Sequence, residues 1–395
     1  MKYSIIVPVY NRPDEVDELL ESLCSQTLKD FEVIIVEDGS KKPCKDVCDK
    51  YANILDLHYY NKENSGPGQS RNYGVERATG DYVIILDSDV VLPNKYLESV
   101  NYSVECRTES VEFATAQSTT VQPSSAQPPT LVENSTPYTQ HSKGVAAFGG
   151  PDATHPSFTP VQKAISYSMT SFFTTGGIRG GKKKLDKFYP RSFNMGIRRD
   201  VYLQLGGFTK MRFGEDIDFS YRIVEAGYQP QLFPDAWVWH KRRTDFRKFF
   251  RQVYNSGIAR INLEKRHPGT MKLVHLLPTV FTLGVIGCLL LFALGVGLYI
   301  EGEWLDANGL RPTDNMHQGV GMVFSVLGLL PLLFYSSVIF IDSSIRNRSL
   351  WVGLLSIPAA FTQLMGYGLG FIESWWKRCI LKQDEFTAFE KNFYK

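Results

Sequence analysis

The chain has 395 residues and a formal net charge of +2 at pH 7, enough for one large domain with an appended region. Its mean hydropathy of −0.17 conceals a polar stretch over residues 1–270 that is followed by three long apolar stretches. Six cysteines are scattered, and Cys44 and Cys48 have no second pair or histidine cluster that would complete a zinc site. This cysteine usage argues against a zinc protein and fits a reducing cytoplasm.

The first 90 residues alternate between expected strands and expected helices. Apolar runs predict strands at residues 3–8, ended by Pro8, at 31–36, weakly at 55–60, and at 82–86. Helices are expected after the first strand and after the loop at 64–72. This order is typical of a mostly parallel, doubly wound α/β sheet that binds nucleotides. Because neither a Gly-x-Gly-x-x-Gly fingerprint nor a Walker loop is present, dinucleotide-binding and ATPase functions are disfavoured.

Asp87-Ser88-Asp89 directly follows the strand expected at 82–86. Open α/β sheets bind ligands outside the carboxyl ends of their strands, which is where these two carboxylates would lie. The carboxylates repel each other unless a cation joins them, and a divalent ion that also binds substrate phosphates would do so. A plain acidic turn is the alternative, since Asp and Ser are common in turns.

Four motifs in this part of the chain resemble those of the family 2 glycosyltransferases, which have the GT-A fold. They are Ile-Val-Pro-Val-Tyr-Asn at 6–11, Val-Glu-Asp-Gly-Ser at 36–40, Ser-Arg-Asn at 70–72 and Leu-Asp-Ser-Asp at 86–89. The pattern continues with Phe-Asn-Met-Gly-Ile-Arg-Arg at 193–199, Gly-Gly-Phe at 206–208 and Gly-Glu-Asp-Ile-Asp-Phe at 214–219. The resemblance covers residues 1–240 and implies a GT-A catalytic domain there, interrupted by an insert at 107–143.

The resemblance also implies roles for individual residues. Asp38 would bond the nucleotide base, Tyr10 would lie against that base, and Arg71 would help to hold the nucleotide. Asp89 would bind Mn²⁺ or Mg²⁺ on the donor diphosphate, and His240 would approach the metal or the diphosphate. The complete donor site implied by the motifs consists of Pro8, Tyr10, Arg12, Asp38, Arg71 and Asp87. One departure is that Glu37-Asp38 stands where relatives have two aspartates, although the base-binding member is retained.

Asp216 matches the catalytic base of the family. A carboxylate near the acceptor can take the proton of the attacking hydroxyl, while a metal at Asp89 stabilises the charge on the departing nucleoside diphosphate. Attack from the opposite face of the sugar carbon would make the enzyme inverting. Without the family context, Glu215-Asp216 would be a solvated acidic helix start and His240 a core or surface histidine.

Two segments have no clear assignment from their sequence. Residues 107–143 are rich in Ser, Thr, Pro and Gln and predict a flexible insert. Residues 174–184 form a glycine-rich stretch ending in three lysines, which could cradle a phosphate or form a mobile, solvated loop.

The C-terminal part predicts membrane attachment. A basic, aromatic segment at 241–270 suits an amphipathic helix in the membrane interface, which makes lipid a better partner than nucleic acid. Apolar stretches at 273–300, 319–341 and 350–372 approach or exceed the roughly 20 residues needed to cross a bilayer, and a tail follows at 376–395. Because basic residues flank the first span, the positive-inside rule places the catalytic domain in the cytoplasm at the plasma (inner) membrane. Three spans would put the tail outside, whereas its basic residues Lys377, Arg378 and Lys382 argue for the inside.

These expectations combine into an inverting, metal-dependent glycosyltransferase of the cell envelope. The donor would be a nucleotide-sugar, with a UDP-sugar preferred, and the acceptor a lipid or lipid-linked molecule. A polyprenyl-phosphate glycosyltransferase is the first alternative, because its phosphate acceptor needs less help from a base. A processive polysaccharide synthase is disfavoured because Gln-x-x-Arg-Trp is absent after Asp216. A silent membrane scaffold is disfavoured by the joint presence of Asp38, Asp89 and Asp216.

Overall fold

The computed structural model of the chain describes residues 2–118, 144–175, 188–308 and 316–386. It divides into two compact units. The sheet unit consists of residues 1–155 and 182–241, and the helical unit consists of residues 156–181 and 242–395. The sequence analysis places residues 156–181 in the catalytic domain, whereas the structure groups them with the C-terminal helices.

A seven-stranded, mostly parallel sheet forms the centre of the sheet unit, as the sequence predicts. Its order is β3 (Leu57–Lys62), β2 (Phe31–Asp38), β1 (Tyr3–Val9), β4 (Tyr82–Leu86), β8 (Asn194–Arg198), β6 (Ala147–Gly149) and β9 (Gln231–Leu232). The first four strands are parallel to one another, and β8 is antiparallel to both β4 and β6. The carboxyl ends of β1, β2 and β4 therefore meet at one edge of the sheet.

Pro8 lies inside β1 rather than at its end. It is in register with Val36 on β2, while the pairing of β1 with β4 stops at Ile6. At Pro8 the strand thus has one neighbour only, so a residue without an N–H is tolerated there. This arrangement carries the strand one residue further than the sequence analysis expects.

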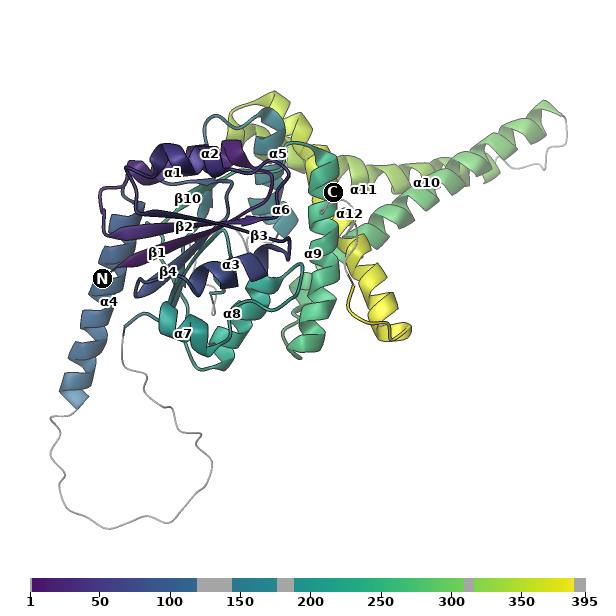
Figure 1. The fold of residues 1–395 in the computed structure, drawn as a ribbon. Coiled ribbons are helices and arrows are strands. Elements are labelled where there is room, and N and C mark those ends of the chain that lie inside the picture. Colours follow the sequence, from purple (N-terminus) through teal and green to yellow (C-terminus); the bar gives the residue numbers. More distant parts are fainter. Residues whose placement is uncertain (1, 119–143, 176–187, 309–315, 387–395) are drawn as a thin grey trace, which may run out of the picture. The chain divides into compact units, whose positions relative to one another are not determined.

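Helices cover both faces of this sheet (Figure 1). On one face lie α1 (Pro13–Cys24) and α2 (Lys45–Tyr51), which bury Val16, Leu19, Leu20, Leu23 and Cys48 against the strands. On the other face lie α3 (Pro67–Val75), α7 (Arg199–Gln204) and α8 (Glu215–Glu225), which bury Val75, Val201, Phe219 and Ile223. Because both faces are covered, the strands are apolar over most of their length.

A second, smaller sheet has the order β5 (Val90–Val91), β10 (Val238–His240) and β7 (Asp152–Ala153). Next to it in the chain, α4 (Tyr96–Ser118) runs into the segment for which an insert is predicted. Residues 107–118 are therefore helical, and residues 119–143 lie outside the described part of the chain.

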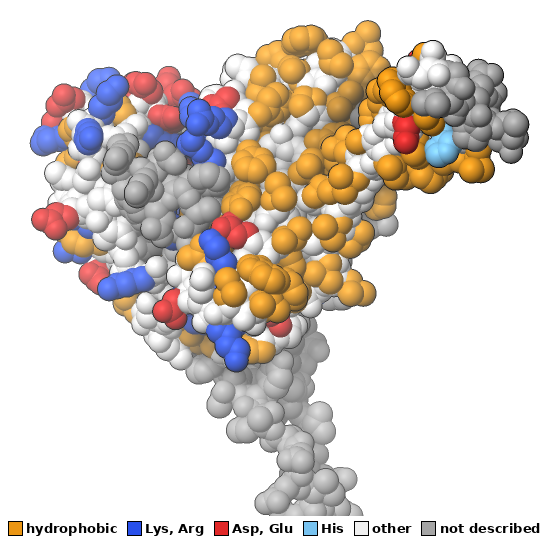
Figure 2. Space-filling view, turned by 90° about the vertical axis from the view of Figure 1, so that its right-hand side faces the viewer, with side chains coloured by type: hydrophobic (Ala, Val, Ile, Leu, Met, Phe, Trp, Pro, Cys, Tyr) orange, Lys and Arg blue, Asp and Glu red, His pale blue; other side chains and the backbone are white. Residues whose placement is uncertain are grey.

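The helical unit begins with α5 (Pro160–Thr170) and α6 (Phe172–Thr175) and resumes with α9 (Phe246–Arg266). It ends with three long helices, α10 (Leu277–Ala307), α11 (Met316–Asn347) and α12 (Leu350–Trp375). By length and composition all three could cross a membrane. Many of their large apolar side chains are exposed, including Leu290, Leu330 and Phe334, and Figure 2 shows such side chains over a wide surface.

Candidate active site

A cluster of two carboxylates and one imidazole lies just beyond the carboxyl end of β4. Ligand atoms of Asp87, Asp89 and His240 all lie within 4.8 Å of one another, and His240 Nε2 is 3.3 Å from Asp89 Oδ1. The small sheet explains this proximity, because His240 is paired with Val90 in the antiparallel ladder between β10 and β5. The Phe193 ring stacks on the imidazole at a centroid distance of 4.9 Å. The structure thus brings together the three residues that sequence analysis assigns to the metal and its neighbour.

Two arginines compensate the carboxylates of this cluster. Arg12 Nη1 lies 2.5 Å from Asp89 Oδ2. Arg71 is 3% exposed and bridges two acids, with Nη2 2.8 Å from Asp87 Oδ1 and Nη1 3.0 Å from Glu215 Oε1. The sequence analysis expects both arginines on the nucleotide. In the structure, Arg71 ties the end of β4 to the start of α8 through these two ion pairs.

Asp38 ends β2 at the same edge of the sheet and holds the loop that leads into α3. Its Oδ1 accepts a hydrogen bond from Ser65 N at 2.9 Å and its Oδ2 accepts one from Gly66 N at 2.9 Å. Lys62 also pairs with this carboxylate. Gly66 has a φ of +91°, a conformation that side-chain-bearing residues rarely adopt. Tyr10, which follows β1, lies half-buried at this edge.

Asp216 lies in the first turn of α8, which begins after Gly214 with a φ of +86°. Its Oδ2 accepts a hydrogen bond from Arg191 Nε at 2.7 Å, and its Oδ1 accepts one from Ile217 N at 2.9 Å. Burial acts to raise the pKa of Asp216, but the positive charge of Arg191 and these hydrogen bonds hold it below its usual value. The carboxyl is therefore ionised at neutral pH.

Glu215, its neighbour, has the opposite environment. Burial raises the pKa of Glu215 to about 7, against the opposing effect of Arg71. Sequence reasoning missed Glu215 as the partner of Arg71 and Arg191 as the partner of Asp216. The acidic pair at 215–216 carries a visible signal for Glu215, but no motif around Arg191 connects it with α8.

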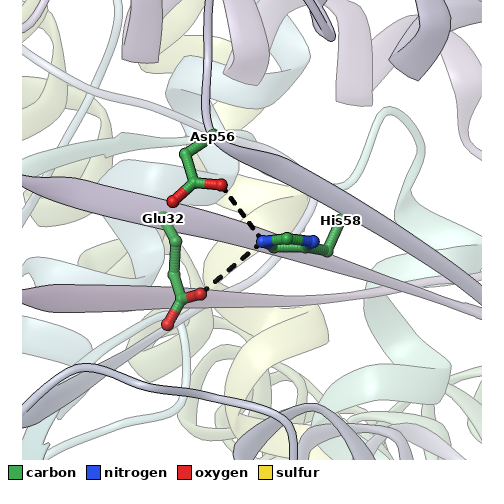
Figure 3. Close-up of side chains that lie close together, drawn as sticks. All are labelled: Glu32, Asp56 and His58. Carbon is green, nitrogen blue, oxygen red and sulfur yellow. Dashed lines mark ion pairs between the residues drawn. The ribbon is translucent and has the colours of Figure 1, made fainter.

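A second cluster of the same composition lies at the opposite edge of the sheet (Figure 3). Its members are Glu32, near the start of β2, with Asp56 and His58, near the start of β3. His58 Nε2 is 3.1 Å from Asp56 Oδ1 and 3.7 Å from Glu32 Oε2. Lys2 Nζ compensates Asp56 at 3.2 Å, and Ser4 Oγ donates a hydrogen bond to Glu32 Oε1 at 2.6 Å. The cluster is thus balanced by the protein's own groups.

The remaining phosphate-binding candidate of the sequence analysis, residues 174–184, falls largely on residues 176–187, which lie outside the described part of the chain.

Comparisons with known proteins match the part of the chain that contributes Asp38, Arg71, Asp87 and Asp89 to this site. Residues 4–143 match the family model for Glycosyl transferase family 2. An uncharacterized glycosyltransferase of Rickettsia felis is 35% identical over 108 residues, which are 26% of this chain and 18% of that protein. The pre-mycofactocin glycosyltransferase of Mycobacterium tuberculosis is 26% identical over 301 residues, which are 75% of this chain and 53% of that protein. The chain thus spans about half of the Mycobacterium relative and less than a fifth of the Rickettsia one.

Among solved structures, the mannosyltransferase PcManGT from Pyrobaculum calidifontis, determined with GDP-Man and Mn²⁺, aligns with a TM-score of 0.49 at 14% identity. The alignment covers 95% of this chain and 88% of that one.

Proposed function

We propose that this chain, whose residues 4–143 match the model for Glycosyl transferase family 2, transfers a sugar from a nucleotide-diphosphate donor to a lipid or lipid-linked acceptor at a membrane. The observation that carries the proposal is that, at the carboxyl edge of the sheet, Asp87 and Asp89 are met within 4.8 Å by His240, which a ladder with Val90 brings in from a strand far along the chain. His240 lies outside the residues that match the family model, and its position beside Asp89 adds a structural observation to that match.

The donor would bind at the carboxyl ends of β1, β2 and β4. Asp38 is fixed there by the amides of Ser65 and Gly66, so its carboxylate presents a rigid acceptor for a base N–H. Tyr10, directly after β1, would offer an aromatic face to the base. Arg12, next to Asp89, places a guanidinium where the diphosphate charge would lie, and a planar guanidinium suits phosphate oxygens. A uridine donor remains our preference.

The carboxylates of Asp87 and Asp89 would hold Mn²⁺ or Mg²⁺, with His240 as a third ligand. Hard divalent cations favour carboxylate oxygens, so the donor set fits such an ion. When bound, the ion would act as a Lewis acid that stabilises the charge of the departing diphosphate. The chain's own contribution is to fix these ligands, because Arg71 holds Asp87 and the ladder between β5 and β10 holds His240 beside Asp89.

Asp216 would take the proton of the acceptor hydroxyl as it attacks the sugar carbon from the face opposite the leaving group, which inverts the configuration. Arg191 keeps this carboxylate ionised and oriented. The same ion pair makes Asp216 a weak base. That observation favours one second candidate, a polyprenyl-phosphate glycosyltransferase, whose acceptor is an ionised phosphate and needs no deprotonation.

The membrane location rests on the long apolar helices. Leu290, Leu330 and Phe334 are each more than half exposed, a surface that lipid would cover. By the positive-inside rule, the basic residues before α10 would put the sheet unit on the cytoplasmic side, and a lipid-linked acceptor would reach the enzyme from that leaflet.

The experiment is turnover by the purified full-length chain in lipid nanodiscs that contain a native lipid extract. A panel of UDP- and GDP-sugars is supplied with Mn²⁺, and released nucleoside diphosphate and glycosylated lipid are followed by mass spectrometry. We expect one donor to yield both products, and Asp89→Asn to yield neither. Absence of donor binding and of turnover across the panel, with a folded protein, would overturn the proposal.

A further inference from the structure

The α10–α11 pair forms a hairpin that packs along its whole length. Near its tip, Gly302 lies against Gln318, and in its middle Gly295 and Gly328 let the two backbones approach closely. Near its base, the rings of Phe281 and Tyr335 are 4.9 Å apart. The last turns of α11, which follow Tyr335, therefore extend past the start of α10.

α12 meets this hairpin at the base. Ser356 Oγ lies 2.6 Å from Ser343 Oγ in the last turns of α11. Further along α12, the Phe361 ring contacts the ring of Phe281, and Thr282 Oγ1 donates a hydrogen bond to Leu364 O at 3.4 Å.

Beyond that point α12 goes no deeper into the hairpin. Gly368 lies against Thr282 Oγ1 and Pro278 O, so four residues further along α12 its partners on α10 are still no further from the start of that helix than Thr282, the partner of Leu364. A helix crossing the bilayer beside α10 would instead advance along it, to the level of residues 285–290. In Figure 1 the yellow end of α12 diverges from the green hairpin.

The second half of α12 packs on α9, with both helices running in the same direction. Gly366 lies against Val253, and Gly370 lies against the backbone of Tyr254. Ser374 Oγ then donates a hydrogen bond to Ile258 O at 3.2 Å. This close packing means that α9 must accompany α12 to whatever depth α12 reaches.

α9 cannot enter a hydrocarbon layer at low cost. Its 21 residues include the charged side chains of Arg247, Lys248, Arg251, Arg260, Glu264, Lys265 and Arg266. A charge at the centre of a bilayer costs roughly 2.5–3.5 kcal/mol on insertion scales. The second half of α12 is thus held at the membrane surface by its partner.

The first half of α12 is flanked in a similar way by α5. Ala164 packs with Val352 and Ala359, and Tyr167 packs with Ala360. In the most apolar 18-residue stretch of α12, 44% is buried inside the protein. The corresponding share is 11% for α10 and 11% for α11. The less buried stripe of α12 is apolar except for Thr362, and Trp376 continues it past the helix end; its apolar members are Trp351, Leu354, Pro358, Met365, Leu369 and Ile372.

We propose that α10 and α11 alone cross the bilayer, and that α12 lies along one leaflet between α5 and α9. Its apolar stripe would rest on the boundary between headgroups and acyl chains. The C-terminal tail with Lys377, Arg378 and Lys382 then lies on the same side as residue 242. With two spans, the basic segment before α10 and the basic C-terminal tail lie on the same side, so both obey the positive-inside rule. With three spans they would lie on opposite sides, and one of them would break the rule.

Cysteine accessibility in sealed membrane vesicles tests the topology whichever way the protein is oriented. Three full-length variants each keep one reactive cysteine: native Cys106 in the sheet unit, native Cys379 after α12, or Ala307→Cys at the end of α10. All three positions are exposed. A membrane-impermeant maleimide is applied before and after detergent. Asp384→Cys, also exposed, is a second tail position in case lipid shields Cys379.

We expect both tail positions to react from the same side as Cys106 and from the side opposite to Ala307→Cys. Labelling of the tail together with Ala307→Cys would overturn the proposal and establish a third span. Labelling of all positions from one side would overturn it as well, because α10 and α11 would then not cross. Neither result depends on turnover, so failure of this proposal and failure of the proposed function are distinguishable.

Discussion

Among its described residues, the sheet unit has two clusters of two carboxylates and one histidine, at opposite edges of one sheet, and their surroundings differ. At the carboxyl edge, the side chains of Asp89 and His240 are 10% and 16% exposed. At the amino edge, those of Asp56 and His58 are 51% and 44% exposed. In both clusters two carboxylates and an imidazole lie close together, so this closeness cannot by itself identify a metal site.

The two clusters differ in how far apart along the chain their members and ion-pair partners lie. Asp56 and His58 are close in sequence and partly exposed, as is Lys2, which pairs with Asp56, and only Glu32, on the neighbouring strand β2, is buried. Asp89 is met by Arg12 from the start of the chain and by His240 from a strand 150 residues further on. Assembling buried charges from distant segments costs desolvation energy, which a functional site repays through ligand binding.

Asp89→Asn should have the largest effect, because it removes a charged ligand of the proposed metal. We expect loss of metal-dependent turnover and of metal-supported nucleotide binding, measured by calorimetry with Mn²⁺. Asp56→Asn is the matched control in the other cluster and should leave both unchanged. Equal losses in the two variants would mean that the clusters do not differ in function.

Asp216→Asn should come next. It keeps the size of the side chain but removes its basicity, so transfer should fall by about 10²–10⁴-fold while donor binding persists. Single-turnover kinetics beside a binding isotherm would separate the two effects. Near-normal transfer would point to the phosphate-acceptor alternative, and loss of donor binding would assign Asp216 a structural role.

Arg191→Gln should shift the pH dependence of kcat/KM. With the cation removed, burial would dominate and the pKa of Asp216 would rise. A base acts when ionised, so the acidic limb of the kcat/KM profile should move to higher pH. Arg198→Gln is the control, since Arg198 pairs with Asp200 on the surface. An unmoved limb would show that Asp216 does not set it.

His58→Gln should have the smallest effect. Both the imidazole and Asp56 are largely exposed, so the unfolding free energy should change by no more than about 0.5 kcal/mol. In the Asp89→Asn background, added Mn²⁺ should not raise the thermal midpoint, whether or not His58 is present. A Mn²⁺-dependent rise that His58→Gln abolishes would make the amino-edge cluster a metal site after all.

Local patterns were enough to predict β1, β2 and β4 well, because each is a short apolar run between turn residues, whereas the more polar β3 is only weakly signalled and lies two residues later than expected. They could also locate Asp38 and Asp87, whose positions at strand ends follow from the strands themselves. The pairing of Arg191 with Asp216 and of Arg71 with Glu215 was not predictable in this way. These contacts depend on how α8 packs on the sheet, and the partners lie 25 and 144 residues apart in the chain.

Helices α5 and α6 belong to the helical unit but lie in the sequence between the two parts of the sheet unit. This arrangement limits where the chain can be cut into fragments that fold. The polypeptide passes between the sheet unit and the helical unit three times, near residues 155, 181 and 241. A chain cut after Lys241 would keep α5 but lose its partners, leaving Ile165 without Phe249 and Tyr167 without Ile339. A soluble catalytic fragment therefore requires excision of residues 156–181 as well, and recombination at a single breakpoint would not transplant this catalytic domain intact.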